Sequence, residues 1–196
     1  IDEWNRQRSI QLDQRNHSEL EIGFSTFFLN RTNRSGIIRG GVIGGKAQSG
    51  TWKLDARYNK QDLIRRIKIL ARYRNRVLLY NFDAVYFIQT ILPEVSSNTL
   101  VYLDPPYYKK GADLYENYYD HCDHALVASH VKHSISQPWI VSYDNVPEIV
   151  TIYSGCKHLN YSLSYSVQNK YFGSEVMYYS DGIILPSDIL PGRINM

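Results

Sequence analysis

The chain has 196 residues, of which 43% are hydrophobic and 21% are charged. This composition fits one or two compact domains and excludes a disordered tail or a small disulfide-bonded scaffold. The formal net charge of +3 is too small to indicate a polyanionic partner unless the cations are clustered.

Localisation follows from what the chain lacks. No apolar stretch approaches the roughly 20 residues that a membrane span needs, and no signal segment opens the chain. Two cysteines, Cys122 and Cys156, cannot frame a small secreted fold. We therefore expect a cytoplasmic protein with free thiols and no membrane partner.

The start of the chain is unusual. It begins with Ile1, and its two methionines are Met177 and Met196. We therefore expect a fragment or a processed chain, in which one half of a two-part site lies outside these residues.

The first fifty residues predict two helices and a loop. Residues 1–20 are polar with scattered apolar points, which indicates a helix and then a loop near Asn16. Residues 20–29 are apolar enough for a buried helix, and the basic segment 30–36 follows it. Six glycines between residues 36 and 50 exclude a regular helix and predict an ordered loop or hairpin.

A basic amphipathic helix is predicted next. Asn59 is a suitable helix cap, and apolar residues follow at helical spacing. Between residues 57 and 76 the chain carries eight Lys or Arg and one acid, Asp62. Two interpretations are open: a solvated helix face, or a surface that faces phosphates.

From residue 77 onward, short apolar strands alternate with helices. Strands are predicted at 77–80, 100–103 and 139–142, and helices at 84–92, 123–135 and 146–153. Two antiparallel strands, 159–167 and 175–185, follow with a turn around 169–173. Such alternation predicts a mainly parallel sheet that binds ligands at the carboxyl ends of its strands.

The strongest chemical signal is Asp104-Pro105-Pro106-Tyr107, directly after the strand at 100–103. Two prolines fix the backbone and force extended geometry on the residues before them. This stiff arm can present the Asp104 carboxylate and the Pro105 carbonyl as two acceptors beside an aromatic plate, which suits a planar aromatic amine. The structural alternative is a turn that merely ends a strand.

Two weaker motifs have ordinary explanations. Residues 40–46 match the spacing of a phosphate-binding loop, but Ala47 replaces the hydroxyl that would hold Mg²⁺. Residues 120–124 resemble a metal cluster, but no second pair of ligands follows at zinc spacing. We expect no metal here and instead a capped helix start with surface histidines.

The Asp-Pro-Pro-Tyr motif resembles that of amino-methyltransferases that use S-adenosylmethionine, and the wider chain is similar to the Dam-type DNA adenine N6-methyltransferases. The resemblance extends over roughly residues 20–185 and includes the segment 27–32, Gly36, Arg39 and the stretches 80–84 and 139–145. The recognition segment precedes the acceptor arm, as it does in that family.

The resemblance implies a reaction and a set of catalytic residues. The reaction is transfer of a methyl group from S-adenosylmethionine to the N6 of an adenine that is flipped out of double-stranded DNA. Asp104 and the Pro105 carbonyl would accept the N6 hydrogens, Pro106 would stiffen the arm, and Tyr107 would stack on the base.

The resemblance also implies two sets of binding residues. The cofactor would contact Asn81, Phe82, Asp83 and Asp104. The DNA would contact Arg31, Asn33, Arg34, Arg39, Lys60, Arg65 and Arg66.

Two departures from the family pattern leave alternatives open. Arg34-Ser35 stands where familiar members have a Tyr-Asn pair, so no target sequence is carried over. No Phe-x-Gly-x-Gly turn is present, so the N-terminal cofactor-binding segment is expected outside this chain. The alternatives are a DNA-binding remnant without its cofactor half and an RNA adenine methyltransferase.

The predicted architecture is thus α/β with two parts. Residues 1–76 form a mostly helical DNA-recognition segment, and residues 77–196 form the C-terminal part of a Rossmann-like methyltransferase core. Its partners would be DNA, S-adenosylmethionine and, in a restriction-modification pair, a cognate restriction endonuclease.

Overall fold

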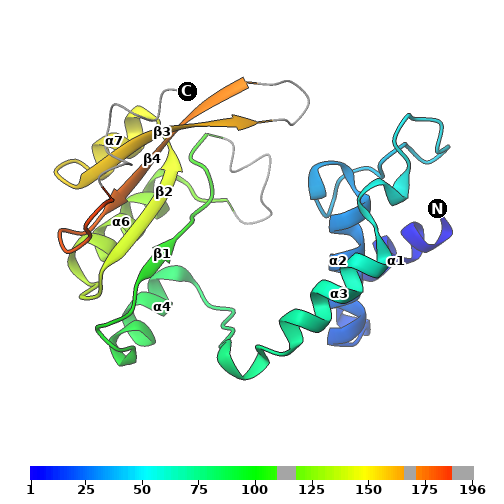
Figure 1. The fold of residues 1–196 in the computed structure, drawn as a ribbon, viewed down its shortest axis with the longest axis horizontal. Coiled ribbons are helices and arrows are strands. Elements are labelled where there is room, and N and C mark those ends of the chain that lie inside the picture. Colours follow the sequence, from blue (N-terminus) through cyan, green and yellow to red (C-terminus); the bar gives the residue numbers. More distant parts are fainter. Residues whose placement is uncertain (110–117, 166–170, 187–196) are drawn as a thin grey trace. The chain divides into compact units, whose positions relative to one another are not determined.

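The computed structural model describes residues 1–109, 118–165 and 171–186 (Figure 1). The chain divides into two compact units, Ile1–Leu79 and Tyr80–Met196. Each unit has a hydrophobic core of its own.

Two packed helices, α1 (Asp2–Leu12) and α2 (Glu19–Thr32), form the body of the first unit. Helix α2 begins with a capping box, in which the Glu21 N–H donates to Ser18 Oγ and the Ser18 N–H donates to Glu21 Oε2. The predicted helix at 20–29 is therefore confirmed, but it is not buried throughout. Leu20 is 82% exposed and Phe24 42%, because α2 packs on α1 and on the loop through one face only.

The small core of this unit consists of Trp4, Phe28, Leu29 and Val42. Val42 comes from the predicted glycine-rich loop, which folds back so that Val42 and Asn33 form an isolated antiparallel bridge. Gly36, Gly44 and Gly45 have positive φ values, which explains why the segment needs glycine. After residue 46 the chain continues in turns rather than in a helix, so it forms no phosphate-binding P-loop.

Helix α3 (Lys60–Ala71) begins where the sequence predicts it. The Asn59 Oδ1 accepts a hydrogen bond from the Asp62 N–H at 3.2 Å, as a helix cap does. Leu63 is the buried residue of this helix, and the following residues 72–79 are exposed.

The second unit contains a four-stranded sheet with the order β1-β2-β4-β3. Its strands are β1 (Val101–Leu103), β2 (Trp139–Asp144), β3 (Lys157–Tyr165) and β4 (Tyr171–Tyr179). Strands β1 and β2 are parallel, whereas β4 pairs antiparallel with both β2 and β3. Among the described strands, β1 and β2 are therefore the one parallel pair. The mainly parallel sheet expected from the sequence is not observed in this part of the chain.

The helices α4 (Ala84–Thr90), α6 (His121–His133) and α7 (Pro147–Ile152) complete this unit. Alternate residues of β2 and β4 join the core with these helices, among them Val141, Tyr143, Val176 and Tyr178. The residues between them, such as Ser142 and Glu175, face the other side of the sheet. The second face of the sheet and the ends of its strands carry Ser142, Glu175 and Asp104.

Most predicted elements of the second unit are confirmed with shifted ends. Helix α4 stops at Thr90, and a 3₁₀ turn, Leu92–Glu94, carries Pro93. The antiparallel hairpin is present, and its connection at 166–170 lies outside the described residues.

The strand predicted at 77–80 is wrong. These residues make no ladder with any described strand, and Leu78 and Leu79 are 82% and 93% exposed. A four-residue apolar run satisfies the strand pattern without specifying a partner, and without a partner its backbone forms no sheet. Within the part of the chain that the structure describes, no helix is long and apolar enough to cross a membrane.

Candidate active site

The Asp-Pro-Pro-Tyr arm leaves the sheet at the end of β1. Strand β1 ends at Leu103, and Asp104 follows with an exposed side chain. Its Oδ1 accepts a hydrogen bond from Ser142 Oγ at 3.0 Å, and Ser142 Oγ also bonds the Tyr102 hydroxyl at 2.8 Å. The neighbouring parallel strand thus orients the carboxylate while leaving it open to a ligand.

A second carboxylate holds the chain after the arm. Asp144, the last residue of β2, accepts hydrogen bonds from the backbone N–H groups of Tyr108 (2.9 Å) and Lys109 (3.3 Å). These bonds fix the path of the backbone beyond Tyr107. The carboxyl ends of β1 and β2 therefore form one continuous polar site, as expected for adjacent parallel strands.

The aromatic member of the arm is fixed through its hydroxyl. Tyr107 is half-buried, and its hydroxyl donates to Glu175 Oε1 at 2.9 Å. Glu175 lies on β4, is 5% exposed, and also accepts from the Tyr161 hydroxyl through Oε2 at 3.0 Å. Burial and the hydrogen bond to Glu175 raise the pKa of Tyr161, so its hydroxyl stays protonated at neutral pH.

The residues expected to contact the cofactor lie just before α4. Asp83 is the cap of α4, where its Oδ1 accepts from the N–H groups of Val85 and Tyr86. The Phe82 ring is 51% exposed and lies 5.7 Å from the Tyr80 ring and 5.1 Å from the Tyr86 ring. Exposed aromatic faces beside a carboxylate fit an adenosine moiety, which stacks through its base and donates through its ribose hydroxyls.

Tyr119 connects the Asp83 segment with the start of α6. Burial and the charge of Asp83 raise the pKa of Tyr119, whose ring contacts the His124 ring at 5.3 Å. The Tyr108 ring, just after the arm, also contacts the His124 ring, at 5.1 Å, so both tyrosines pack on the start of α6.

Residues 120–124 form a capped helix start, as predicted. Asp120 and Asp123 make a reciprocal capping box at the beginning of α6. His121 is exposed, but His124 is fully buried against the Tyr143 hydroxyl, 3.0 Å from its Nδ1, so the expectation of surface histidines is wrong for His124. Burial lowers its pKa. No group of three or more metal-ligating side chains is found among the described residues.

The first unit presents the predicted DNA-binding residues around its glycine-rich loop. Asn33 is an exception, because its side chain is fully buried. Its Oδ1 accepts from Trp4 Nε1 at 2.7 Å, and its Nδ2 donates to the carbonyl oxygens of Ile37 and Ile38, both at 2.9 Å. Asn33 therefore shapes the loop and does not present its amide to a ligand, which corrects the expected contact with DNA.

The arginines around the loop differ in exposure. Arg34 and Arg39 are exposed. Arg31 is half-buried, and its Nε donates to the Arg57 carbonyl oxygen at 3.1 Å.

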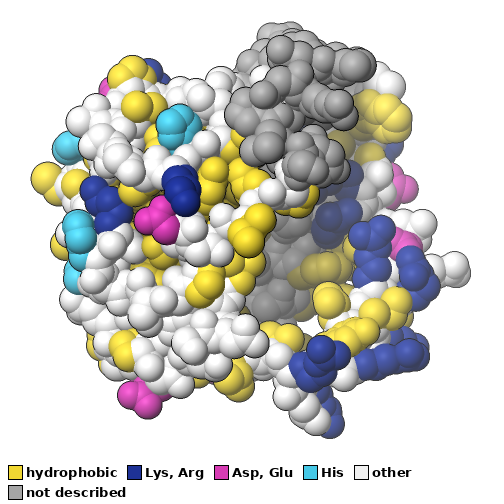
Figure 2. All heavy atoms as spheres, turned by 60° about the vertical axis from the view of Figure 1, so that its left-hand side comes forward, with side chains coloured by type: hydrophobic (Ala, Val, Ile, Leu, Met, Phe, Trp, Pro, Cys, Tyr) yellow, Lys and Arg dark blue, Asp and Glu magenta, His cyan; other side chains and the backbone are white. Residues whose placement is uncertain are grey.

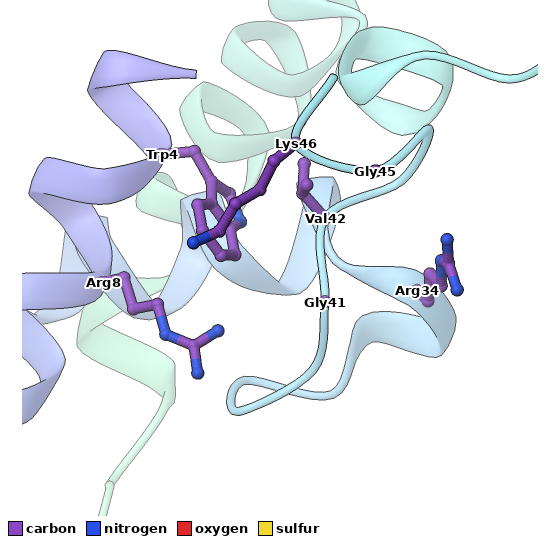
Figure 3. Close-up of a pocket in the computed structure, with 7 residues that line it drawn as sticks. All are labelled: Trp4, Arg8, Arg34, Gly41, Val42, Gly45 and Lys46. Atoms are coloured by element: carbon purple, nitrogen blue, oxygen red, sulfur yellow. The ribbon is translucent and has the colours of Figure 1, made fainter. Parts of the chain in front are cut away.

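A cavity of about 350 Å³ lies beside Trp4 in this unit (Figure 3). Three cations, Arg8, Arg34 and Lys46, are among its lining residues, and no acid is. The Arg8 guanidinium lies 5.2 Å from the centre of the Trp4 ring and donates to the Gly40 carbonyl oxygen. Figure 3 shows Arg8 and Lys46 on one side of the backbone segment 41–45 and Arg34 on the other. A cavity that is lined by cations and by no acid suits an anionic ligand such as a phosphate.

The basic helix α3 carries the remaining predicted contacts. Asp62 pairs with Arg65 (2.6 Å) and Arg66 (2.7 Å), which leaves a local excess of positive charge on and after the helix. In Figure 2 the Lys and Arg side chains crowd one region of the surface at the lower right. Lys60 is exposed at the first turn of this helix.

Glu175 and Arg8 were not identified from the sequence. Ser142 and Asp144 lie in the stretch 139–145 that carries the family resemblance, and Lys46 ends the motif at 40–46, but no role was predicted for these three side chains. Ser142 and Glu175 are polar residues inside otherwise apolar strands, which is a detectable signal because a buried polar group needs a partner. Nothing local in the sequence indicates that Arg8 and Lys46 share a cavity, since they are 38 positions apart.

The fold and the site together define an α/β protein with an Asp-Pro-Pro-Tyr arm at the carboxyl edge of two parallel strands. The comparisons with known proteins agree. A family model described as D12 class N6 adenine-specific DNA methyltransferase matches residues 2–167. A search of curated proteins finds no match. The chain therefore belongs to the D12 class of adenine-specific DNA methyltransferases, which confirms the Dam-type resemblance and DNA adenine N6-methylation as its function.

Proposed function

We propose that this chain transfers the methyl group of S-adenosylmethionine to the N6 of an adenine flipped out of double-stranded DNA. The observation that carries the proposal is the exposed Asp104 carboxylate, held by Ser142 on a rigid arm whose tyrosine is anchored to Glu175. Family membership supports the DNA substrate and the type of reaction.

The acceptor arm explains how a weak nucleophile is activated. The lone pair of adenine N6 is delocalised into the ring, so N6 attacks poorly. Asp104 and the Pro105 carbonyl oxygen accept its two hydrogens, which localises the lone pair and directs it toward the methyl donor. Holding the reactants in this geometry supplies much of the rate enhancement.

In the transfer, the new N6–CH₃ bond forms as the methyl–sulfur bond breaks, and N6 then loses one proton. Asp104, which would accept a hydrogen bond from N6, would take that proton. Tyr107 holds the base by stacking, which offsets part of the few kcal/mol that unstacking from the duplex costs.

The residues before α4 fit the adenosine part of the cofactor. Phe82 would stack on its base, Asn81 and Asp83 would meet its polar groups, and Asp104 would lie next to its reactive end. When bound, S-adenosylmethionine supplies an electrophilic methyl group. For the fold of residues 77–196, we propose the C-terminal part of a Rossmann-like methyltransferase core.

The first unit, including residues 1–76, is proposed to hold the DNA. Arg31, Arg34 and Arg39 surround the loop that Asn33 shapes, and Lys60, Arg65 and Arg66 lie on α3. We add Arg8 and Lys46, whose cavity would take one backbone phosphate. A DNA substrate and two free cysteines are consistent with action in the cytoplasm, and a paired restriction endonuclease is part of the proposal.

The test is transfer of a tritiated methyl group from S-adenosylmethionine to unmethylated duplex DNA. We expect Asp104→Ala to abolish transfer while its DNA affinity stays within about twofold of wild type. Asp181→Ala is the matched control, since Asp181 is an exposed carboxylate outside the site.

Other outcomes distinguish the alternatives. Salt-sensitive DNA binding with neither cofactor affinity nor transfer would indicate a DNA-binding remnant. Faster transfer to RNA of the same sequence would indicate an RNA methyltransferase. Full activity of Asp104→Ala would overturn the role of the arm.

A further inference from the structure

Glu175 is a carboxylate buried inside a β-sheet. It is 5% exposed and lies on β4, paired with Asp144 of β2 on one side and with Tyr161 of β3 on the other. Burying a carboxylate is costly unless hydrogen bonds satisfy both oxygens. Both Glu175 oxygens accept from tyrosine hydroxyls, Oε1 from Tyr107 and Oε2 from Tyr161.

The two tyrosines come from different parts of the fold. Tyr161 is a strand neighbour of Glu175, so their contact is local to the hairpin. Tyr107 belongs to the arm after β1, and β2 lies between β1 and β4 in the sheet. The Tyr107–Glu175 bond therefore spans the end of β2 and ties the arm to a strand that is not the sheet neighbour of β1.

We propose that Glu175 is a positioning residue for methyl transfer, which fixes the orientation of the Tyr107 ring by accepting its hydroxyl. This inference rests on the proposed function. The ring of a tyrosine turns about two side-chain torsions, and a charge-assisted hydrogen bond at its far end restrains both. A ring held in this way meets the flipped base in one orientation.

Tyr161 has a supporting role in this arrangement. By donating to Oε2, it fixes the Glu175 carboxylate so that Oε1 faces Tyr107. The Tyr161 hydroxyl is a donor at neutral pH, as that of any tyrosine is, and burial raises its pKa further. The three side chains thus form a chain of two hydrogen bonds that ends at the arm.

The experiment compares Glu175→Gln, Tyr107→Phe and the double variant in the full chain. Glutamine keeps the size of the side chain but replaces one acceptor oxygen by a donor, and phenylalanine keeps the ring without the hydroxyl. We expect each single variant to lower kcat by tenfold to about a hundredfold, since small misplacements of reacting groups have effects of this size. The affinity for S-adenosylmethionine, measured by calorimetry, should stay within about twofold.

The double variant tests whether Glu175 acts through Tyr107. If it does, the loss in the double variant equals that of the more affected single variant, because both changes remove the same bond. Asp181→Asn, a neutralised exposed carboxylate just after β4, is the control and should retain wild-type kcat.

Three results would overturn the inference: wild-type kcat in folded Glu175→Gln, wild-type kcat in Tyr107→Phe, or additive losses in the double variant. Loss of cofactor affinity and melting temperature together with kcat would also count against it, because that pattern indicates a structural role. If Glu175→Gln does not fold, the kcat of Tyr107→Phe still tests whether the bond between the two side chains is needed for methyl transfer. If the wild-type chain transfers no methyl group, the proposed function itself fails. This result differs from failure of the inference about Glu175, in which the wild-type chain is active.

Discussion

In both units a segment at the surface is held in place by a buried polar side chain, but the two segments carry opposite charges. Each contains a segment to which we assign a function, the basic loop in the first unit and the arm with Asp104 in the second. Each restrains that segment with one buried polar side chain that bonds several partners, Asn33 in the loop and Glu175 beside the arm. Asn33 is a neutral amide that bonds backbone carbonyls and shapes a chain, whereas Glu175 is a carboxylate that bonds hydroxyls and orients side chains.

This contrast shows what each segment requires. A surface that binds a phosphate backbone needs cations in roughly the right place, since phosphate contacts carry no sequence information. A site that transfers a methyl group needs an aromatic ring and an acceptor at defined positions. We assign DNA binding to the first unit and methyl transfer to the second, and variants that affect one activity without the other test this assignment.

The largest effect is expected from Asp104→Asn in the second unit. The amide keeps one acceptor but places an NH₂ group where the second oxygen was, so methyl transfer should fall by on the order of a hundredfold to a thousandfold. DNA affinity, which we assign to the first unit, should stay within about twofold in a fluorescence anisotropy titration. A parallel loss of DNA affinity would contradict the division.

The next effect is expected from Asn33→Ala in the first unit. The change leaves the Trp4 N–H and two backbone carbonyls without their partner, which should lower the free energy of unfolding by about 2–3 kcal/mol. Urea unfolding followed by tryptophan fluorescence measures this. Asn5→Ala, an exposed position on α1, is the control and should change stability by less than about 0.5 kcal/mol.

A smaller effect is expected from the double variant Arg8→Gln/Lys46→Gln. If their cavity holds one phosphate, DNA affinity should fall about tenfold and the slope of log K against log salt should decrease by about one. Arg15→Gln/Lys157→Gln removes the same net charge from exposed positions outside the cavity and should leave the slope unchanged. An equal change in both double variants would show that net charge alone matters.

The smallest effect concerns the pH dependence of the second unit. Burial lowers the pKa of His124 below its ordinary value of 6.5, so below pH 6.5 the unfolded chain binds more protons than the native state. The stability that neutral His124 contributes is therefore complete above this pH and decreases as the pH falls. Melting temperatures between pH 8 and pH 5 should show a decline below pH 6.5 that is reduced in His124→Gln. An unchanged decline would assign the pH dependence to other groups.

Local signals in the sequence predict much of the secondary structure. The caps at Asn59 and Asp120 and the spacing of the apolar residues after them identify α3 and α6, because capping and helical periodicity act within a few residues. The prolines of the arm fix its extended path for the same reason. The failed strand at 77–80 marks the limit, since strand formation depends on a partner that local sequence does not specify.

The sequence by itself determined the helices, the arm with Asp104 and Tyr107, and through its motifs the methyltransferase family. Only the tertiary structure decided that β4 inserts between β2 and β3, that Glu175 meets Tyr107 across 68 positions, and that Asn33 is buried. Caps, prolines and periodicity act between near neighbours and can be recognised in the chain. A hydrogen bond between distant residues depends on strand order and register, which are fixed when the sheet and its core pack together.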